Sequence, residues 1–244
     1  MPVEPTARPA LVAALRQLGV GESAAEALSR QAQSRRLDEG DSLCLSCAGM
    51  GLALVMRGTL LRQIHFHDGS IGGTELLFSG QFLFASGCGQ GSDDNVRYLA
   101  LEAGELLWVP MAWVYEICRI HKGFLEIYME RKHRYSRMVE DHLLLRSILS
   151  KKEHIVMTLA MIFSAKLRRN EYGIRITIED LCTVTGATRQ YYSKVIAELC
   201  QKKILENHYG SLQLCDYAGL KAELGEDARR HYDLFRAKPV AVAA

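Results

Sequence analysis

The pattern of apolar and polar residues changes several times along the chain, and each change marks a different kind of element. Residues 9–36 carry apolar side chains at helical spacing, interrupted near Gly19 and Gly21, so we expect helical structure there. Across residues 40–110 short apolar runs alternate with glycines, and this part holds 12 of the chain's 20 glycines. Short strands separated by turn residues predict an antiparallel sandwich or barrel, with residues 67–70 (His-Asp-Gly-Ser) as a hairpin turn.

Residues 111–150 are almost free of glycine and return to helical spacing. Apolar positions along this helix alternate in steps of three and four, which is the heptad pattern of a coiled coil. The helix could pack on its own domain or pair with a second copy of the chain. We favour pairing, because so long a helix after a small β domain has more apolar seam than one neighbour would cover. The expected dimer contacts are Tyr128, Tyr135, Met138, His142, Leu145 and Leu149, with Arg131 as an imperfect member of the same seam.

The C-terminal part of the chain combines two helices, a glycine turn and a hairpin. Residues 153–169 have helical spacing, and Thr177 is placed to cap a short helix that follows them. Gly186 supplies a turn, and Thr188 is placed to cap the helix within GATRQYYSKVIAEL. Two short strands within residues 204–216 complete the pattern. This order predicts a winged helix-turn-helix.

The second helix of this motif has two different faces. Tyr192, Val195, Ile196 and Leu199 recur at helical spacing and are expected to face a core. The other face carries hydrogen-bond donors and no acid. In helix-turn-helix proteins this part of the second helix meets base edges in the major groove, where Arg and Lys suit guanine and Gln suits adenine. The alternatives are a solvated helix face or a winged helix that contacts protein. The candidate DNA-contacting residues are Thr188, Arg189, Gln190, Ser193 and Lys194.

Charge is unevenly distributed along the chain, although the net charge is only +2. Residues 1–150 hold 15 Lys and Arg against 17 Asp and Glu, whereas residues 151–222 hold 11 against 7. The basic excess therefore lies in the segment with the predicted helix-turn-helix. Such an excess favours a polyanionic partner, although it is small.

Composition excludes several other classes of protein. No apolar run approaches the roughly 20 residues that a membrane helix needs, and the first residues lack the pattern of a secretory signal. Seven irregularly spaced cysteines argue against a secreted disulfide framework, so we expect a cytoplasmic protein without a membrane partner. We assign no catalytic residues, because no nucleophile–base pair, phosphate-binding loop or metalloprotease motif is present.

The segment ITIEDLCTVTGATRQYYSKVIAELCQKKILENHYGSLQL resembles the DNA-binding end of the CRP/FNR transcription regulators. EGDSLCLSCAGMGLALVMRGTL resembles the opening strands of that family's β-roll, and the likeness covers roughly residues 35–222. The resemblance implies an α+β fold with a cupin-like β-roll of the cyclic-nucleotide-binding kind. It also implies a homodimer on double-stranded DNA, a near-palindromic operator and contact with RNA polymerase. The expected domains are 1–122 (N-terminal helix and β-roll), 123–150 (dimerisation helix), 151–222 (winged helix-turn-helix) and 223–244 (C-terminal tail).

The predicted recognition helix departs from the family's usual pattern at two positions. The family usually carries a Glu and an Arg four residues apart, where this chain has Gln190 and Lys194. Gln cannot accept a hydrogen bond from cytosine as a carboxylate does, and Lys lacks the bidentate fork of Arg. The family's typical TGTGA-like half-site is therefore not expected here.

The β-roll departs further from the cyclic-nucleotide-binding members of the family. The matching stretch, GQFLFASGCGQGSDDNVRYLALE, has no Gly-Glu-Leu turn, and its Asp93-Asp94-Asn95 lies near the position of the usual phosphate-binding Arg. Two carboxylates there would repel a phosphate, and Arg97 is the only basic residue nearby. We therefore expect that the roll does not bind a cyclic nucleotide.

Several other signals remain open, and no cofactor can be named. An uncharged or organic-acid effector could bind in the roll. Cys44 and Cys47, with Cys88 and Cys118, could in principle hold an iron–sulfur cluster, although strand alternation would point the first two to opposite faces. A thiol switch, with Cys88 as the best candidate, is another possibility. His65 and His67, expected on one strand face, could bind haem or a metal, but idle cysteines and histidines are commoner. The candidate effector-pocket residues are Phe84, Cys88, Arg97, Tyr98 and Trp108.

Overall fold

The computed structural model describes residues 7–84, 95–208 and 211–236. Within these ranges the chain divides into two compact units. Of the described residues, the N-terminal unit comprises 7–65, 77–84 and 95–137, and the C-terminal unit comprises 66–76, 138–208 and 211–236. The fold mixes helices and sheets, as expected.

Two four-stranded sheets form the β-roll, and their described pairings are antiparallel. The first sheet has the order β1-β8-β3-β6 and the second has the order β2-β7-β4-β5. The strands are β1 (Gln33–Leu37), β2 (Ser42–Leu43), β3 (Met50–Arg57), β4 (Thr59–His65), β5 (Ile71–Phe78), β6 (Phe82–Phe84), β7 (Val96–Ala100) and β8 (Gly104–Pro110). The apolar runs between glycines are therefore strands, as predicted.

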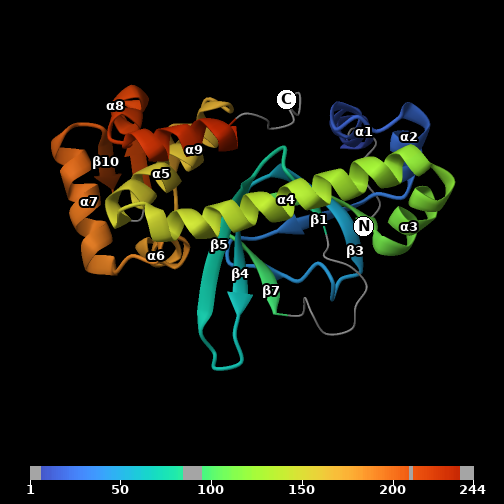
Figure 1. Ribbon diagram of the computed structural model, residues 1–244, viewed down its shortest axis with the longest axis horizontal. Helices are drawn as coiled ribbons and strands as arrows, with labels where there is room; N and C mark the ends of the chain where they lie inside the picture. The colour runs from blue at the N-terminus through green and yellow to red at the C-terminus, as the bar shows by residue number, and fades with distance from the viewer. Residues whose placement is uncertain (1–6, 85–94, 209–210, 237–244) are drawn as a thin grey trace. The chain divides into compact units, whose positions relative to one another are not determined.

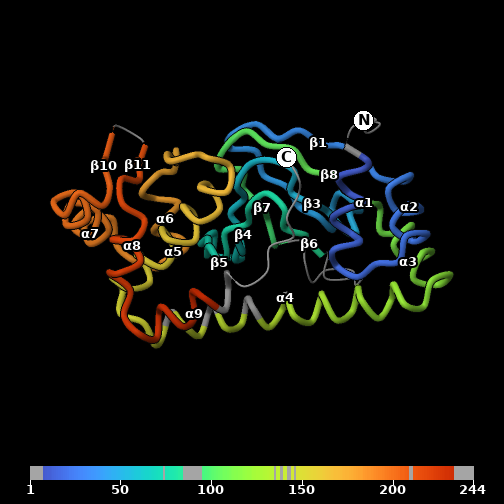
Figure 2. Tube along the Cα trace, turned by 90° about the horizontal axis from the view of Figure 1, so that it is seen from above, coloured from blue at the N-terminus to red at the C-terminus, as the bar shows by residue number. Residues whose placement is uncertain are grey.

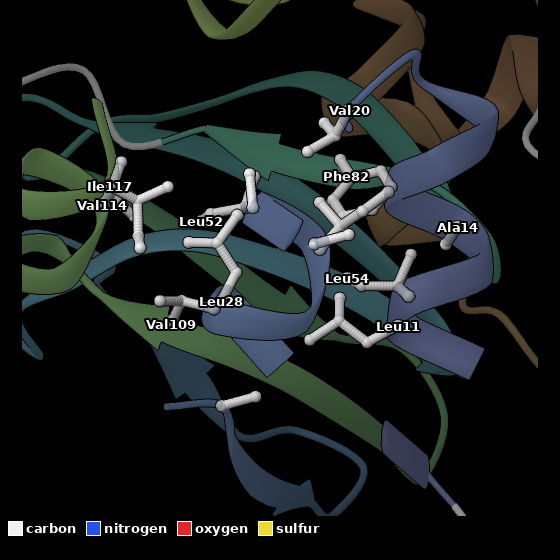
Figure 3. Close-up of a cluster of buried hydrophobic side chains, with 14 of the residues drawn as sticks. Leu11, Ala14, Val20, Leu28, Leu52, Leu54, Phe82, Val109, Val114 and Ile117 are labelled. Atoms are coloured by element: carbon white, nitrogen blue, oxygen red, sulfur yellow. The ribbon is translucent and has the colours of Figure 1, made fainter. Parts of the chain in front are cut away.

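The central strands β3 and β8 of the first sheet are largely buried on both faces, which explains why they are nearly continuous apolar runs, whereas the edge strand β1 is polar and partly exposed. Along β3, Leu52 and Leu54 belong to one hydrophobic cluster, whereas Ala53 and Val55 belong to another. Successive strand residues point to opposite faces, so the two clusters lie on the two sides of the sheet. We call the cluster with Leu52 and Leu54 the outer cluster, and the cluster with Ala53 and Val55 the inner cluster. Figure 3 shows the first cluster, in which Leu52, Leu54 and Val109 meet residues of the N-terminal helices.

This outer face of the first sheet is covered by α1 (Ala7–Gln17), α2 (Glu22–Arg30) and α3 (Met111–Ile120), and by Phe124 and Tyr128 from the start of the long helix that follows α3. Figure 2 shows the three helices grouped beside β3 and β8. The helical prediction for residues 9–36 is correct for α1 and α2 but wrong at its end. Residues 33–36 belong to β1, because they pair with β8, and Ser34, for example, faces Leu107 in the antiparallel register.

The predicted long helix is present, with a break near its start. α3 ends before His121, and α4 (Lys122–Ile148) then continues as the longest helix in the described chain, as Figure 1 shows. Around the predicted hairpin turn, the Phe66 amide donates to the Ser70 carbonyl at 2.9 Å. Asp68 accepts from the Ser70 amide and hydroxyl at 2.9 and 2.6 Å, which fixes the turn between β4 and β5.

The C-terminal unit contains the predicted helix-turn-helix and wing. Its elements after α4 are α5 (Lys151–Leu167), β9 (Gly173–Ile174), α6 (Ile178–Thr185), α7 (Arg189–Gln201), β10 (Leu205–His208), β11 (Ser211–Leu214), α8 (Tyr217–Ala222) and α9 (Glu226–Arg236). β10 and β11 form the wing, and β9 adds an unpredicted third strand to it. Beyond the boundary expected at residue 222, Ala228 and Tyr232 of α9 are buried and α9 packs on α5. The unit therefore includes α9.

Candidate nucleic-acid interface

The geometry of α6 and α7 follows from two threonine caps and one glycine. Thr177 accepts a hydrogen bond from the Asp180 amide at 3.0 Å, and Thr188 accepts one from the Tyr191 amide at 3.3 Å. Between the helices Gly186 adopts φ = +65°, and its amide donates to the Cys182 carbonyl at 2.8 Å. A residue with a side chain is strained in this left-handed conformation, so glycine allows the tight turn.

The two faces of α7 separate as the sequence predicts. Tyr192, Val195, Ile196 and Leu199 are buried, and burial raises the pKa of the Tyr192 phenol well above its usual range. The predicted DNA-contacting residues are all exposed and lie at the cap and on the first two turns of the helix: Thr188, Arg189, Gln190, Ser193 and Lys194. Tyr191 lies among them with 36% exposure. It was not among the predicted DNA-contacting residues.

Arg189 has a partner on the neighbouring helix. Its guanidinium forms an ion pair with the Glu179 carboxylate of α6, and both side chains are 68% exposed. Glu179 lies in the first turn of α6, where a negative charge suits the positive end of the helix. In the structure Glu179 also places a negative charge beside the exposed face of α7.

A groove of about 440 Å³ runs between α6, α7 and the wing. Arg189 and Ser193 line it from α7, and Asn207 and Ser211 line it from β10 and β11. The two wing residues were missed by the sequence reasoning. The predicted hairpin was the available signal, because wing strands lie next to the second helix of this motif. Figure 2 shows β10 and β11 side by side near α7.

Near the other end of α7, charged side chains are tied to neighbouring elements. Lys152 of α5 donates to Glu198 at 2.6 Å, and Lys202 donates to Glu223 at 2.6 Å. The hydrogen bond from Lys152 lowers the pKa of Glu198, and the same bond raises the pKa of Lys152. These contacts hold α7 on its domain and leave Gln190 and Ser193 exposed at its beginning.

The predicted effector-pocket residues do not gather in one place. Phe84 belongs to the outer cluster of the first sheet, 5.5 Å from the Tyr128 ring, whereas Tyr98 and Trp108 belong to or pack on the inner cluster. The prediction of one shared pocket is therefore wrong for Phe84, because alternate strand positions point to opposite faces. Arg97 lies next to Cys47, with its Nη1 3.8 Å from the sulfur. Cys88 and Asp93-Asp94 lie outside the described residues.

The cysteine and histidine predictions need correction. Cys44 and Cys47 lie in a turn after β2 rather than along a strand, and they form a disulfide. Cys118 instead packs on the outer cluster of the first sheet. His65 ends β4 and His67 is in the following turn, so they do not share a strand face. Among the described residues, no group of three His, Cys, Asp or Glu side chains could hold a metal ion.

The predicted seam of α4 is partly buried within the chain itself. Tyr128 is 8% exposed and donates to the Gly51 carbonyl at 3.2 Å, and Arg131 donates to the Leu18 carbonyl at 3.2 Å. Leu145 and Leu149 are also buried. Tyr128, Leu145 and Leu149 are therefore covered within the chain and offer little surface to a partner. The side chains of Tyr135, Met138 and His142 lie outside the described ones. Among the described side chains of α4, the large apolar ones that are exposed are Leu125, Met129, Leu144 and Ile148.

The chain was compared with protein families, curated sequences and solved structures. No protein-family model and no curated protein sequence matches the chain. A regulator of the CRP/FNR family from Eubacterium rectale matches with a TM-score of 0.60 and 16% identity, over 88% of this chain and 97% of its own. FixK2 from Bradyrhizobium japonicum matches with a TM-score of 0.62 and 15% identity, over 80% and 98%. The c-di-GMP-responsive regulator CLP from Xanthomonas campestris matches with a TM-score of 0.60 and 14% identity, over 80% and 100%.

No helix in the described part of the chain has the length and apolar character needed to cross a membrane. The β-roll, the long helix and the winged helix-turn-helix occur here in the order predicted from the sequence. The three regulators above share this fold, with TM-scores of 0.60, 0.62 and 0.60. The chain therefore has the fold of the CRP/FNR transcription regulators.

Proposed function

We propose that the chain is a sequence-specific DNA-binding transcription regulator that acts as a homodimer on a near-palindromic operator. Its signal is an effector or a redox change other than a cyclic nucleotide. The observation that carries this proposal is the exposed face of α7, where Gln190, Ser193 and Lys194 stand on the first two turns of the second helix of a helix-turn-helix. A protein with this role is a regulator and not an enzyme.

The exposed face has the chemistry that a major groove needs. Gln190 offers a donor and an acceptor that match adenine, and Lys194 offers donors to guanine O6 and N7. The first turn of α7 carries no acidic residue, so its amide groups and positive end are compatible with phosphate. Asn207 and Ser211 of the wing line the protein groove between α6, α7 and the wing, and their side chains are suited to contact the DNA backbone.

The test begins with selecting a preferred site from random DNA with the full-length protein. Gln190→Ala and Lys194→Ala are each expected to weaken binding to that site by about 1–3 kcal/mol and to relax the base preference. Lys151→Ala is a matched control, because it removes one exposed charge from α5 rather than from α7. Binding is measured by fluorescence anisotropy at several salt concentrations.

Two results would contradict the proposal in different ways. Equal losses on selected and random DNA would make Gln190 and Lys194 phosphate contacts only. Absence of any salt-sensitive DNA binding would instead favour the alternative, a sensor whose winged helix contacts protein, because phosphate contacts make affinity fall steeply with salt.

The homodimer is supported by exposed apolar side chains on α4. Leu125 and Met129 are 43% and 55% exposed, which is unusual for apolar residues one turn apart on a helix. Met129→Glu is expected to shift the protein toward monomer in analytical ultracentrifugation. Arg134→Glu changes an exposed residue on another face of α4 and should leave the association unchanged. A dimer that survives Met129→Glu combined with Leu125→Glu would exclude this face as the interface.

A further inference from the structure

The turn between β2 and β3 holds two cysteines together by its backbone. The Ala48 amide donates to the Cys44 carbonyl at 3.1 Å, and the Gly49 amide donates to the Ser46 carbonyl at 3.0 Å. Gly49 adopts φ = +65°, which closes the turn before β3 begins at Met50. The Cα atoms of Cys44 and Cys47 are 5.3 Å apart, within the range that a disulfide bridges. Backbone hydrogen bonds therefore keep the two sulfurs near each other whether or not they are bonded.

The two sulfur atoms have different surroundings. Cys44 is 9% exposed, accepts a hydrogen bond from the Cys47 amide at 3.2 Å, and lies 3.1 Å from the Ser46 hydroxyl. Cys47 is less buried, and its sulfur accepts from Arg97 Nη1 at 3.8 Å. An incoming thiolate therefore reaches Cys47 more easily. The Cys44 thiolate that leaves would be stabilised by the amide and the hydroxyl, and a Cys47 thiolate would be stabilised by the guanidinium.

The turn is also joined to the interior of the β-roll. Leu43 and Leu45, on either side of Cys44, are buried in the inner cluster, and Ala48 packs against the same cluster. Leu43 pairs with Tyr98 of β7, and Trp108 packs on the same cluster. A change in the bonding between the cysteines therefore acts on side chains that fill the space between the two sheets.

We propose that Cys44 and Cys47 form a reversible dithiol–disulfide site that exchanges two electrons with a dithiol reductant. A thiolate of the dithiol attacks Cys47 Sγ, the bond between the two cysteines breaks, and the electron pair leaves on Cys44. The second thiol of the reductant then attacks its own first sulfur and releases Cys47. The dithiol becomes a cyclic disulfide, and its two protons end on the two cysteine sulfurs. The further claim that this change alters operator binding rests on the proposed function.

The site itself is tested on the full-length protein without DNA. The protein is equilibrated with mixtures of reduced and oxidised dithiothreitol, free thiols are alkylated, and the tryptic peptide 37–57 is weighed. That peptide contains Cys44 and Cys47 and no other cysteine. A tenfold change in the ratio of reduced to oxidised dithiothreitol is expected to change the ratio of doubly alkylated to unalkylated peptide tenfold. Singly alkylated peptide as the main product, or double alkylation in every mixture, would overturn the proposal.

Arg97 gives a second and independent measurement. In reduced protein, Arg97→Gln is expected to slow alkylation of Cys47 severalfold near neutral pH, and Arg97→Lys should restore most of the rate. Arg35→Gln is the control, because it removes an exposed guanidinium from β1 of the same unit. A merely structural role for Arg97 would leave the pH dependence of the alkylation rate unchanged, and that result would remove Arg97 from the site.

The regulatory claim is tested separately with the operator selected from random DNA. The oxidised protein, the reduced protein and the double variant Cys44→Ser/Cys47→Ser are compared, and the double variant is expected to bind as the reduced form does under both conditions. Equal binding by the oxidised and reduced protein would overturn the regulatory claim and leave the redox site standing. Absence of DNA binding in all forms would overturn the proposed function, while the alkylation experiment would still decide the site.

Discussion

The two units build their candidate sites from differently spaced parts of the sequence. In the C-terminal unit, Gln190, Ser193 and Lys194 are neighbours on one helix, within two turns of a single cap. In the N-terminal unit, the candidate redox site joins Cys47 to Arg97, 50 positions further along the chain. A helix brings residues together at fixed short spacing, whereas a sheet brings them together only after its strands have paired. The first kind of site can be found from a pattern, and the second requires the fold.

The largest effect on stability is expected when a residue on the buried face of α7 is replaced, compared with a residue on its exposed face. Tyr192→Ala should lower the free energy of unfolding of the C-terminal unit by about 3–5 kcal/mol, because it empties a fully buried aromatic position. Tyr191→Ala, one residue earlier and partly exposed, should cost far less. Urea denaturation followed by far-ultraviolet circular dichroism measures both. Similar losses for the two variants would mean that the faces of α7 are not divided as described.

The next effect concerns the packing of the β-roll. A Cβ atom at Gly51 would lie 2.7 Å from the Met111 Cα and 2.9 Å from Val114 Cγ2, so Gly51→Ala should cost about 1–3 kcal/mol. Gly123→Ala is the control, because nothing lies within 4 Å of its Cβ position in α4. Both tryptophans, Trp108 and Trp113, belong to the N-terminal unit, so their fluorescence in urea reports its unfolding. Equal midpoints for both variants would contradict the close approach of β3 and α3.

A smaller effect is expected at the start of α7. Thr188→Ala removes the oxygen that accepts from the Tyr191 amide, and it should cost about 1 kcal/mol of unfolding free energy. Thr188→Ser keeps that oxygen and should retain most of the stability. Thr177→Ala, at the matching cap of α6, should cost a similar amount. If Thr188→Ala were silent in urea denaturation, the local cap would not explain where α7 begins.

The smallest effect is expected from the ion pair between α5 and α7. The hydrogen bond from Lys152 lowers the pKa of Glu198 in the folded protein. Its contribution to stability is therefore present above the unfolded pKa of about 4.3 and is lost as the pH falls through the lower folded value. The stability difference between the wild type and Glu198→Gln should shrink on acidification below about pH 4. If urea denaturation showed this stability difference growing as the pH falls, the result would contradict a lowered pKa of Glu198.

Most of the element order could be predicted from the sequence, and the reasons for the failures are physical. The caps at Thr177 and Thr188 and the turn at Gly186 are local signals, so α6 and α7 were predicted correctly. β1 was predicted as helix, because only pairing with β8 selects the strand. The seam of α4 was correctly recognised as apolar, but spacing alone could not show that Tyr128 and Leu145 pack within their own chain.

In the candidate sites, too, local patterns were predicted correctly and contacts made by strand pairing were missed. The exposed residues of α7 follow from helical spacing, whereas Asn207 and Ser211 enter the groove through strand pairing and escaped prediction. The shared pocket for Phe84 and Tyr98 failed because the two residues belong to different hydrophobic clusters. The nearness of Cys44 and Cys47 escaped prediction because a turn, and not a strand, carries them.

The ion pair between Arg189 and Glu179 has a consequence for discrimination between DNA sequences. In the proposed complex, any group on DNA that engages Arg189 must take it from a carboxylate, so Glu179 acts as a built-in competitor. Carboxylate and phosphate both accept charge-assisted and often bidentate hydrogen bonds from Arg, so exchanging one for the other gains the guanidinium little. Guanine O6 and N7 instead offer a pair of acceptors that no other base presents in the major groove. Breaking the ion pair costs the same free energy whichever group takes Arg189. A contact weaker than the ion pair therefore leaves Arg189 on Glu179, and only a stronger contact releases it, so Arg189 adds affinity only at sites that outcompete the carboxylate.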